Sequence, residues 1–136
     1  MALYIPGPAS STIVIPLTGE QVNIAHGAVL LTMPDWFESR VLEALPIWTL
    51  NTAPVGSAAQ FDIRVGGTSI FATLPTIAAG ARTTRGAAAP AVFSAAFIAA
   101  GHVLAASANV TFHCLQVGST TAGAGAKVGL PSRRGA

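Results

Sequence analysis

The chain has 136 residues, which is enough for one domain with a hydrophobic core. Hydrophobic residues make up 51% of it and charged residues only 9%, against roughly 25% charged residues in a typical soluble domain, which favours a surface partly buried in an assembly. The net charge is only +2, and no basic stripe is interleaved with aromatic residues, which argues against specific nucleic-acid binding. The single cysteine excludes an internal disulfide.

The N-terminal residues 1–11 contain Pro6, Gly7 and Pro8, a composition that predicts an extended arm and not a helix. The segment lacks the basic and apolar regions of a secretory signal. Short apolar runs and turn signals after it predict a single β-sandwich domain over 12–131. A tail is expected at 132–136.

The domain is expected to be all-β. Turn residues separate about eight or nine short strands, with the spacing of an antiparallel β-sandwich or jelly roll. Segment 33–45 is ambiguous, because residues 34–38 also fit the first turn of a helix. The predicted strands are 12–17, 21–32, 41–50 with a break at Pro46, 61–65, 69–74, 91–98, 102–106, 109–117 and 126–130.

The clearest local signal is a hairpin within 61–80. Apolar and charged side chains alternate from Phe61 to Val65, which is the period of a half-buried strand. Gly66-Gly67 follows and separates this run from the next one. Two such residues predict a two-residue turn, because the turns that suit hairpins need positive φ.

The stretch 86–108 is apolar enough to raise the question of a membrane span. It is dominated by alanine, which contributes little to insertion, and it contains Pro90, Gly101 and His102. We therefore expect strands and turns there, and no membrane association.

No combination of residues predicts catalysis, a metal site or a cofactor. Asp35 and Glu38 fit a solvated turn better than the facing carboxylates of a glycosidase. His113 and Cys114 are neighbours on a strand, so their side chains point to opposite faces and form no nucleophile–base pair. The histidine spacing matches no zinc site, and the glycine-rich loops fit hairpin turns better than phosphate loops. An enzyme is not expected.

Partner contact is expected at the arm, at aromatic side chains and at the C-terminal arginines. Aromatic residues near a polar, proline-containing segment can anchor a partner subunit, although packing inside the domain fits them equally well. The arginine pair fits a solvated tail or contact with an acidic partner. The candidate contact residues are Pro6, Pro8, Trp36, Phe37, Trp48, Arg133 and Arg134.

Five short stretches between Pro46 and Leu130 combine turns with strand edges. They are NTAPVGS (51–57), DIRVGGTSIF (62–71), PTIAAG (75–80), QVGS (116–119) and GAGAKV (123–128). Together they resemble a β-rich module of tailed-bacteriophage virion proteins, which include head decoration, head fibre and tail-associated proteins. The strand before QVGS departs from the module, because FHCL at 112–115 stands where related modules carry acidic residues. The loss of charge suits a surface turned toward other subunits.

The resemblance implies a phage capsid decoration, or cement, protein. Such a protein would bind the major capsid protein on the outer surface of the phage head and stabilise contacts between capsid subunits. It would be a homo-oligomer, with a trimer favoured, made in the host cytoplasm and carried in the virion. The alternative is a head or tail fibre module that binds host carbohydrate, for which Asp35, Trp36 and Arg40 form the one cluster of suitable residue types.

Overall fold

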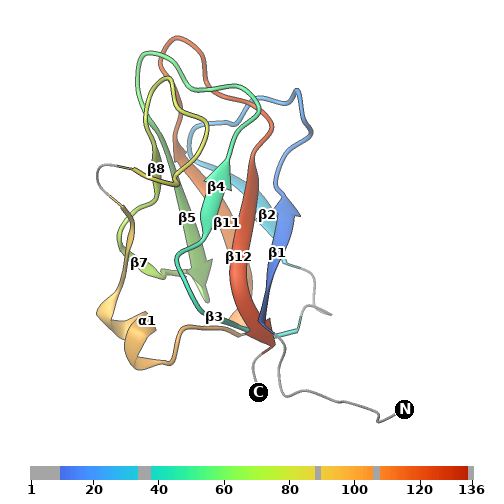
Figure 1. Cartoon of the computed structure of the whole chain (residues 1–136), viewed down its shortest axis with the longest axis vertical. Coiled ribbons are helices and arrows are strands. Elements are labelled where there is room, and N and C mark those ends of the chain that lie inside the picture. Colours follow the sequence, from blue (N-terminus) through green and yellow to red (C-terminus); the bar gives the residue numbers. More distant parts are fainter. Residues whose placement is uncertain (1–9, 34–37, 88–89, 106–107, 135–136) are drawn as a thin grey trace.

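A computed structural model describes residues 10–33, 38–87, 90–105 and 108–134, and only the backbone of residues 10 and 11. Its regular structure is almost all β, with one short helix, α1 (Ala95–Ala99), in the described part (Figure 1). The strands are β1 (Ser10–Pro16), β2 (Ala28–Thr32), β3 (Arg40–Leu42), β4 (Ile47–Thr49), β5 (Ala59–Val65), β6 (Thr68–Ser69), β7 (Phe71–Thr73), β8 (Thr76–Ile77), β9 (Val92–Phe93), β10 (Val103–Leu104), β11 (Val110–Gln116) and β12 (Lys127–Arg134).

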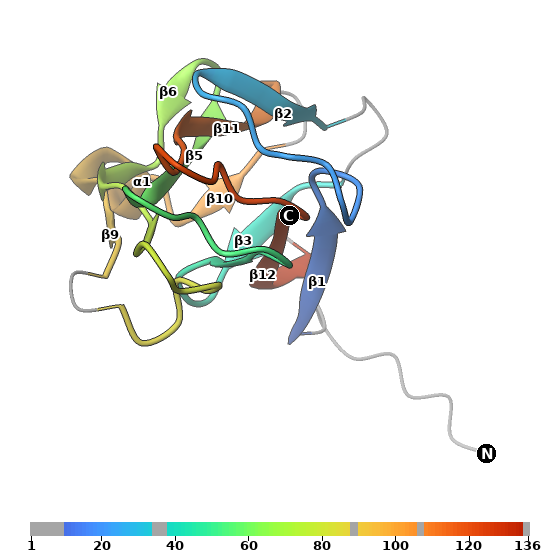
Figure 2. The ribbon, with the colours of Figure 1, turned by 90° about the horizontal axis from the view of Figure 1, so that it is seen from above.

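Two antiparallel sheets form the body of the domain. The first has the order β1-β12-β3-β10, with β4 also paired to β12. The second has the order β2-β11-β5-β6, with β8 also paired to β5, and β7 and β9 form a small separate ladder. Figure 2 shows β1, β12 and β3 on one side of the molecule and β2, β11 and β5 on the other. The predicted all-β antiparallel sandwich is confirmed, whereas the finer assignment to a jelly roll stays a prediction.

The core lies between the sheets and contains a row of aromatic rings. Trp48 on β4 is fully buried and stacks on Phe61 of β5, with ring centroids 5.6 Å apart. Phe71 packs edge-on against Trp48 at 6.0 Å, and the row continues through Phe93 to Phe97 of α1 at 5.7 and 5.1 Å. Aromatic pairs of this kind contribute about 0.5–1.5 kcal/mol each beyond area burial. The row therefore ties α1 to the sandwich.

The predicted hairpin turn is present between β5 and β6. Gly66 and Gly67 have φ of 59° and 84°, and Val65 pairs with Thr68 across the turn. Positive φ at both central residues is the geometry of the turn that matches strand twist. The glycine pair therefore turns the chain, as its sequence indicates.

Loops 51–57 and 118–125, which carry part of the phage-module resemblance, meet at one end of the sandwich (Figure 1, top). The Val55 N–H donates to the Thr121 carbonyl over 2.9 Å, and Thr52 forms a bridge with Ala124. Gly118 packs so tightly that a Cβ there would lie 1.9 Å from the Thr121 carbonyl oxygen. Three of the stretches singled out in the sequence, 51–57, 116–119 and 123–128, thus meet at this end of the scaffold.

The strand predicted at 91–98 is wrong beyond its first residues. The structure has the short strand β9 followed by α1. Ser94 caps the helix, since its Oγ accepts a hydrogen bond from the Phe97 N–H over 3.1 Å. Alanine is the best helix former, and Gly101, with φ of 86°, follows the helix. Capping and alanine propensity together outweigh the apolar alternation.

The boundaries of the domain also differ from the expected ones. β12 runs to Arg134, because Ser132 and Arg133 are paired on both sides, with β1 and β3. The predicted tail at 132–136 is therefore wrong for residues 132–134. At the other end β1 already begins at Ser10, within the predicted arm. Residues 1–9 lie outside the described part of the chain.

Candidate interaction face around Arg64

The contact residues predicted near the N-terminus and on aromatic side chains are not brought together. Pro6, Pro8, Trp36 and Phe37 lie outside the described residues. Trp48 is 0% exposed and packs in the core. The prediction that Trp48 contacts a partner is wrong for this fold, because its ring is enclosed between the sheets. Core packing, the other interpretation of its sequence position, is what the structure shows.

The two C-terminal arginines lie on β12 and form surface ion pairs. Arg133 Nε is 4.0 Å from Glu43 Oε2, and Arg134 Nη1 is 3.8 Å from Glu38 Oε2. All four side chains are exposed by more than a third. Exposed pairs of this kind contribute about 0–1 kcal/mol to stability. The two arginines are therefore accessible to solvent, but no surrounding residue that the structure describes holds them in a fixed binding geometry.

The residues expected to bind carbohydrate are not assembled either. Asp35 and Trp36 lie outside the described residues. The Arg40 guanidinium is turned to the neighbouring strand, where Nε donates to Ser132 Oγ over 2.9 Å and Nη2 to the Ser132 carbonyl over 3.3 Å. Arg40 therefore fastens β3 to β12.

A hollow of about 420 Å³ lies beside Arg133 and Glu43. His102 lines it, with its ring packed edge-on against Phe93 and Phe97 at 5.3 and 5.7 Å. The described residues that line this hollow include no hydroxyl or thiol side chain. Among these described residues there is therefore no serine, threonine, tyrosine or cysteine side chain for the imidazole to activate.

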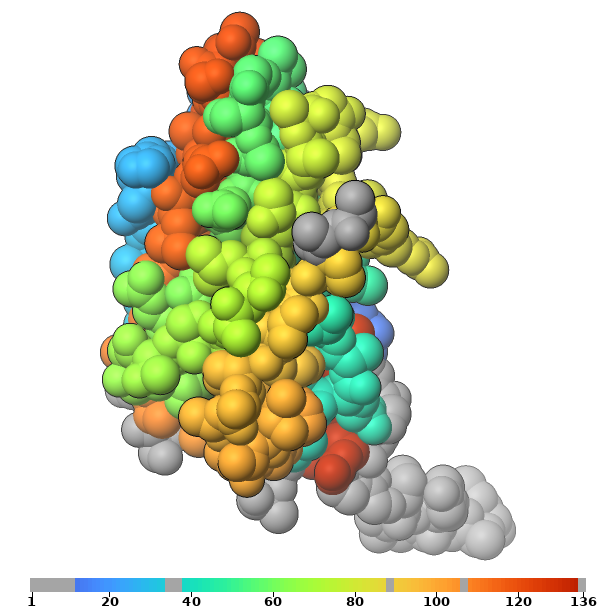
Figure 3. Space-filling model, turned by 90° about the vertical axis from the view of Figure 1, so that its left-hand side faces the viewer, coloured from blue at the N-terminus to red at the C-terminus, as the bar shows by residue number. Residues whose placement is uncertain are grey.

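Two further hollows flank the loop of residues 84–87, which stands out from the body in Figure 3. Small or apolar side chains line them, and among the described lining residues Arg85 is the charged one in each hollow. In the described ranges no group of three or more His, Cys, Asp or Glu residues could hold a metal ion. The helical part of those ranges also contains no segment long and apolar enough to cross a membrane.

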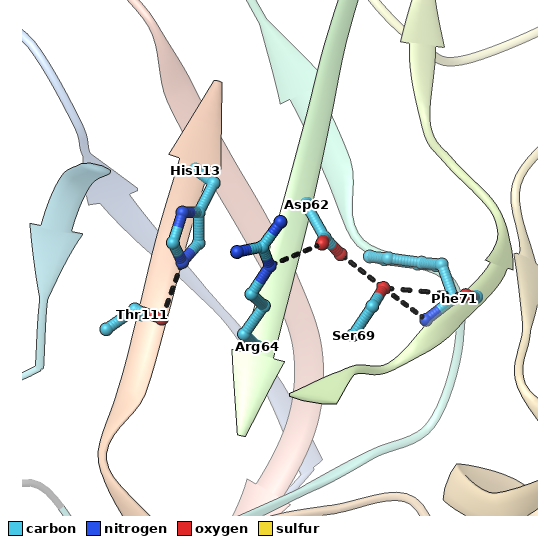
Figure 4. Close-up of polar contacts among 6 residues, drawn as sticks. All are labelled: Asp62, Arg64, Ser69, Phe71, Thr111 and His113. Carbon is cyan, nitrogen blue, oxygen red and sulfur yellow. Dashed lines mark hydrogen bonds and ion pairs between the residues drawn. The ribbon is translucent and has the colours of Figure 1, made fainter. Parts of the chain in front are cut away.

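The most organised polar cluster lies on the outer face of the sheet that contains β5 and β11 (Figure 4). Phe61 and Ile63 of β5 point into the core, so the alternate residues Asp62 and Arg64 point away from it. Directly opposite Asp62 on β11 is His113. Strand alternation and register alone therefore gather an acid, a guanidinium and an imidazole.

Asp62 is nearly inaccessible although it lies on the outer face. Its side chain is 2% exposed, and Oδ1 accepts a hydrogen bond from Ser69 Oγ over 2.5 Å. Oδ2 accepts one from Arg64 Nε over 3.0 Å. Ser69 Oγ itself accepts from the Phe71 N–H over 3.1 Å. The hairpin that places β6 beside β5 thus covers the carboxylate and fixes its orientation.

Arg64 is held by this carboxylate and yet remains partly open to solvent. Its side chain is 36% exposed. Nε is used by Asp62, while Nη1 and Nη2 have no hydrogen-bond partner among the described residues. A guanidinium offers five N–H donors in a planar fork. Four of them therefore remain available to a second acceptor, in a side chain whose orientation is already fixed.

His113 flanks Arg64 on β11. Its Nε2 and Thr111 Oγ1 are hydrogen-bonded at 2.7 Å. Burial lowers the pKa of His113, the positive charge of Arg64 lowers it further, and Asp62 opposes the two effects. On the other side of His113, Val29 of β2 is 54% exposed.

We call this surface the Arg64 face; it comprises Val29, Asp62, Arg64, Thr111 and His113. Its formal charges cancel between Asp62 and Arg64, so it offers directed donors more than a strong positive potential. None of these five residues is among the described residues that line the three hollows. The Arg64 face is therefore separate from the hollows. The arrangement is suited to docking an acceptor group beside an apolar side chain.

No family model, no curated protein and no solved structure matches this chain. Its function is therefore inferred from its own residues and geometry. The Arg64 face was not among the predicted contact sites. Its signal in the sequence is the pair of charged residues, Asp62 and Arg64, that alternates with apolar residues in 61–65 and predicts a half-buried strand.

Proposed function

We propose that this chain is a bacteriophage capsid decoration protein that docks on the outer surface of the head through the Arg64 face. The observation that carries the proposal is the arrangement of Arg64, whose Nε is fixed by the buried Asp62 carboxylate while its Nη groups remain open. The resemblance to phage virion modules and the charged content of 9% point in the same direction. The role is structural, and the protein acts by binding the major capsid protein.

The chemistry of docking follows from the geometry of this side chain. A carboxylate of a capsid subunit can accept from Nη1 and Nη2 of Arg64, a charge-assisted contact with defined direction. Asp62 has already immobilised the side chain, so binding loses less side-chain entropy than it would with a free arginine. Val29, 54% exposed, supplies an apolar contact beside it. Arginine is also enriched among the residues that dominate binding energy at interfaces.

The head would be stabilised by many copies of the protein, each bound to neighbouring capsid subunits. A stable interface buries on the order of 1,000 Å² or more, and each copy needs only a moderate affinity when neighbouring subunits are held in a fixed lattice. A rigid sandwich with few charges suits this role, because few charged groups lose their hydration on docking.

The proposal is tested by counting copies of the chain in purified particles with quantitative mass spectrometry. A decoration protein is present in on the order of hundreds of copies per head, because it repeats with the capsid lattice. A handful of copies would indicate a fibre or tail-associated protein, and absence from particles would contradict a virion role altogether.

A further inference from the structure

In the described residues the paths of the two main sheets end in four edge strands, and the short strands β4 and β8 are also paired on one side only. One of these edges differs from the others. β1 has seven residues and pairs with β12 at every position without a register shift. β10 and β6 have two residues each, and β2 is bulged, with a shift opposite Phe112 and His113. Short and bulged edges resist pairing with another chain. Within the described residues, β1 is the long, regular edge (Figure 1, dark blue).

β1 also lacks the charges that usually protect such an edge. Its sequence, SSTIVIP, contains no charged residue, and Pro16 stands only at its end. Val14, one residue past its centre, is 64% exposed, more than any other large hydrophobic side chain in the described part. Ile13 and Ile15 instead point inward and pack against the core. An edge strand leaves every second N–H and C=O group turned away from its sheet.

We propose that β1 pairs antiparallel with β1 of a second copy of this chain, across a two-fold axis at Val14. In this register Val14 faces Val14 of the second copy and Ile13 faces Ile15. Thr12 faces Pro16, which can accept a hydrogen bond through its C=O but has no N–H to donate. The sheets of the two copies then form one continuous sheet, with no like charges opposed and with an apolar pair at the centre. The second copy is the occupant that this edge fits best, because the strand is complementary to itself about Val14.

A two-fold interface of this kind closes after two copies. The proposal therefore predicts a dimer, whereas the phage-module resemblance implies a trimer. β1 belongs to the sheet opposite the Arg64 face, as Figure 2 shows, so dimerisation leaves that face open. The inference does not rest on the proposed function, and either one can fail without the other.

The test is disulfide trapping of the full chain with Val14→Cys. Directly opposed residues in an antiparallel pair have Cα atoms about 4.5 or 5.5 Å apart, which a disulfide can span. The native Cys114 should contribute little to cross-linking, because its thiol is buried and burial raises its pKa to about 11. Val29→Cys is the matched control, since Val29 is 54% exposed on the bulged edge strand β2.

Under diamide we expect Val14→Cys to give a covalent dimer on a non-reducing gel, at least about tenfold faster than Val29→Cys. Equal rates would overturn the proposal. Sedimentation of the unmodified chain should show a dimer that Val14→Lys converts to a monomer with an unchanged circular dichroism spectrum. A monomer at all concentrations, a trimer, or a dimer unaffected by Val14→Lys would also overturn it. A dimer of the last kind would have to form through a surface that does not include Val14.

Discussion

Arg64 Nε lies 3.0 Å from Oδ2 of Asp62, and the two side chains are 36% and 2% exposed. The pair is asymmetric, with a buried acceptor and a partly open donor. Its stabilising effect therefore comes mainly from satisfying the carboxylate, since the charge of Arg64 is screened by water. The same asymmetry fixes the orientation of Arg64 and leaves its Nη groups open at the surface.

Asp62→Asn tests this relationship. The amide retains one acceptor oxygen but loses the charge, so it cannot satisfy both Ser69 and Arg64 as the carboxylate does. We expect the free energy of unfolding in urea to fall by about 1–3 kcal/mol. Ser69→Ala, which removes one hydrogen bond to the same carboxylate, should cost about 1 kcal/mol. Unchanged stability in Asp62→Asn would show that the carboxylate is not a structural anchor.

Trp48 offers a test of the core. Its indole Nε1–H is buried and has no hydrogen-bond partner among the described residues. Trp48→Ala should lower the free energy of unfolding by about 3–5 kcal/mol, because it removes the ring that stacks on Phe61. Trp48→Phe keeps an aromatic ring and removes the unpaired donor, so it should cost at least about 2 kcal/mol less than Trp48→Ala. Equal losses measured by denaturant titration would contradict this account.

Gly118 should be irreplaceable in the joined loops. A Cβ there would lie 1.9 Å from the Thr121 carbonyl oxygen and 2.7 Å from the Val55 nitrogen. Gly118→Ala should therefore open the loops and lower the melting temperature strongly, or prevent folding. Gly67→Ala is the control: φ at Gly67 is 84°, but a Cβ there meets nothing within 4 Å. It should cost only about 1–2 kcal/mol of backbone strain. A milder effect at Gly118 than at Gly67 would be inconsistent with the packing.

His113 should make the fold sensitive to acid. Its pKa in the fold is lowered from 6.5, first by burial and second by the charge of Arg64. The unfolded chain therefore binds a proton more readily, and the free energy of unfolding should decrease as pH falls below 6.5, until the folded form is also protonated. His113→Gln retains a partner for Thr111 and should flatten this slope in urea titrations at a series of pH values. Equal slopes in the two proteins would exclude His113 as the source.

The sequence predicted those parts of the fold that depend on local chemistry. The turn at Gly66-Gly67 needs positive φ, and the break at Pro46 between β3 and β4 was visible from proline alone. The apolar pattern of 91–98 predicts a strand, but over so few residues such a pattern does not distinguish a strand from a helix. There the cap at Ser94 decided in favour of α1.

The site was harder to predict than the fold. Alternation correctly turns Asp62 away from the core, but its burial depends on Ser69 and Arg64 closing over it, which is a property of the folded hairpin. His113 comes to face Asp62 only through the register of β11 with β5. For Trp48 the sequence does not decide, because a large aromatic ring near a proline fits packing in the core and contact with a partner equally well. The structure places it in the core.

The proposed decoration role is tested most directly by equilibrium binding of the purified chain to phage heads that lack it. Arg64→Ala should raise Kd about tenfold or more, which corresponds to about 1.4 kcal/mol, whereas Arg82→Ala in an exposed loop should leave Kd unchanged. Because Arg64→Ala leaves the Asp62 carboxylate without one partner, Val29→Asp serves as a second variant of the same face that does not disturb the core. Loss of binding in both face variants, with Arg82→Ala like wild type, is the predicted result. Wild-type affinity in both, or no binding by the wild-type chain itself, would contradict docking through the Arg64 face.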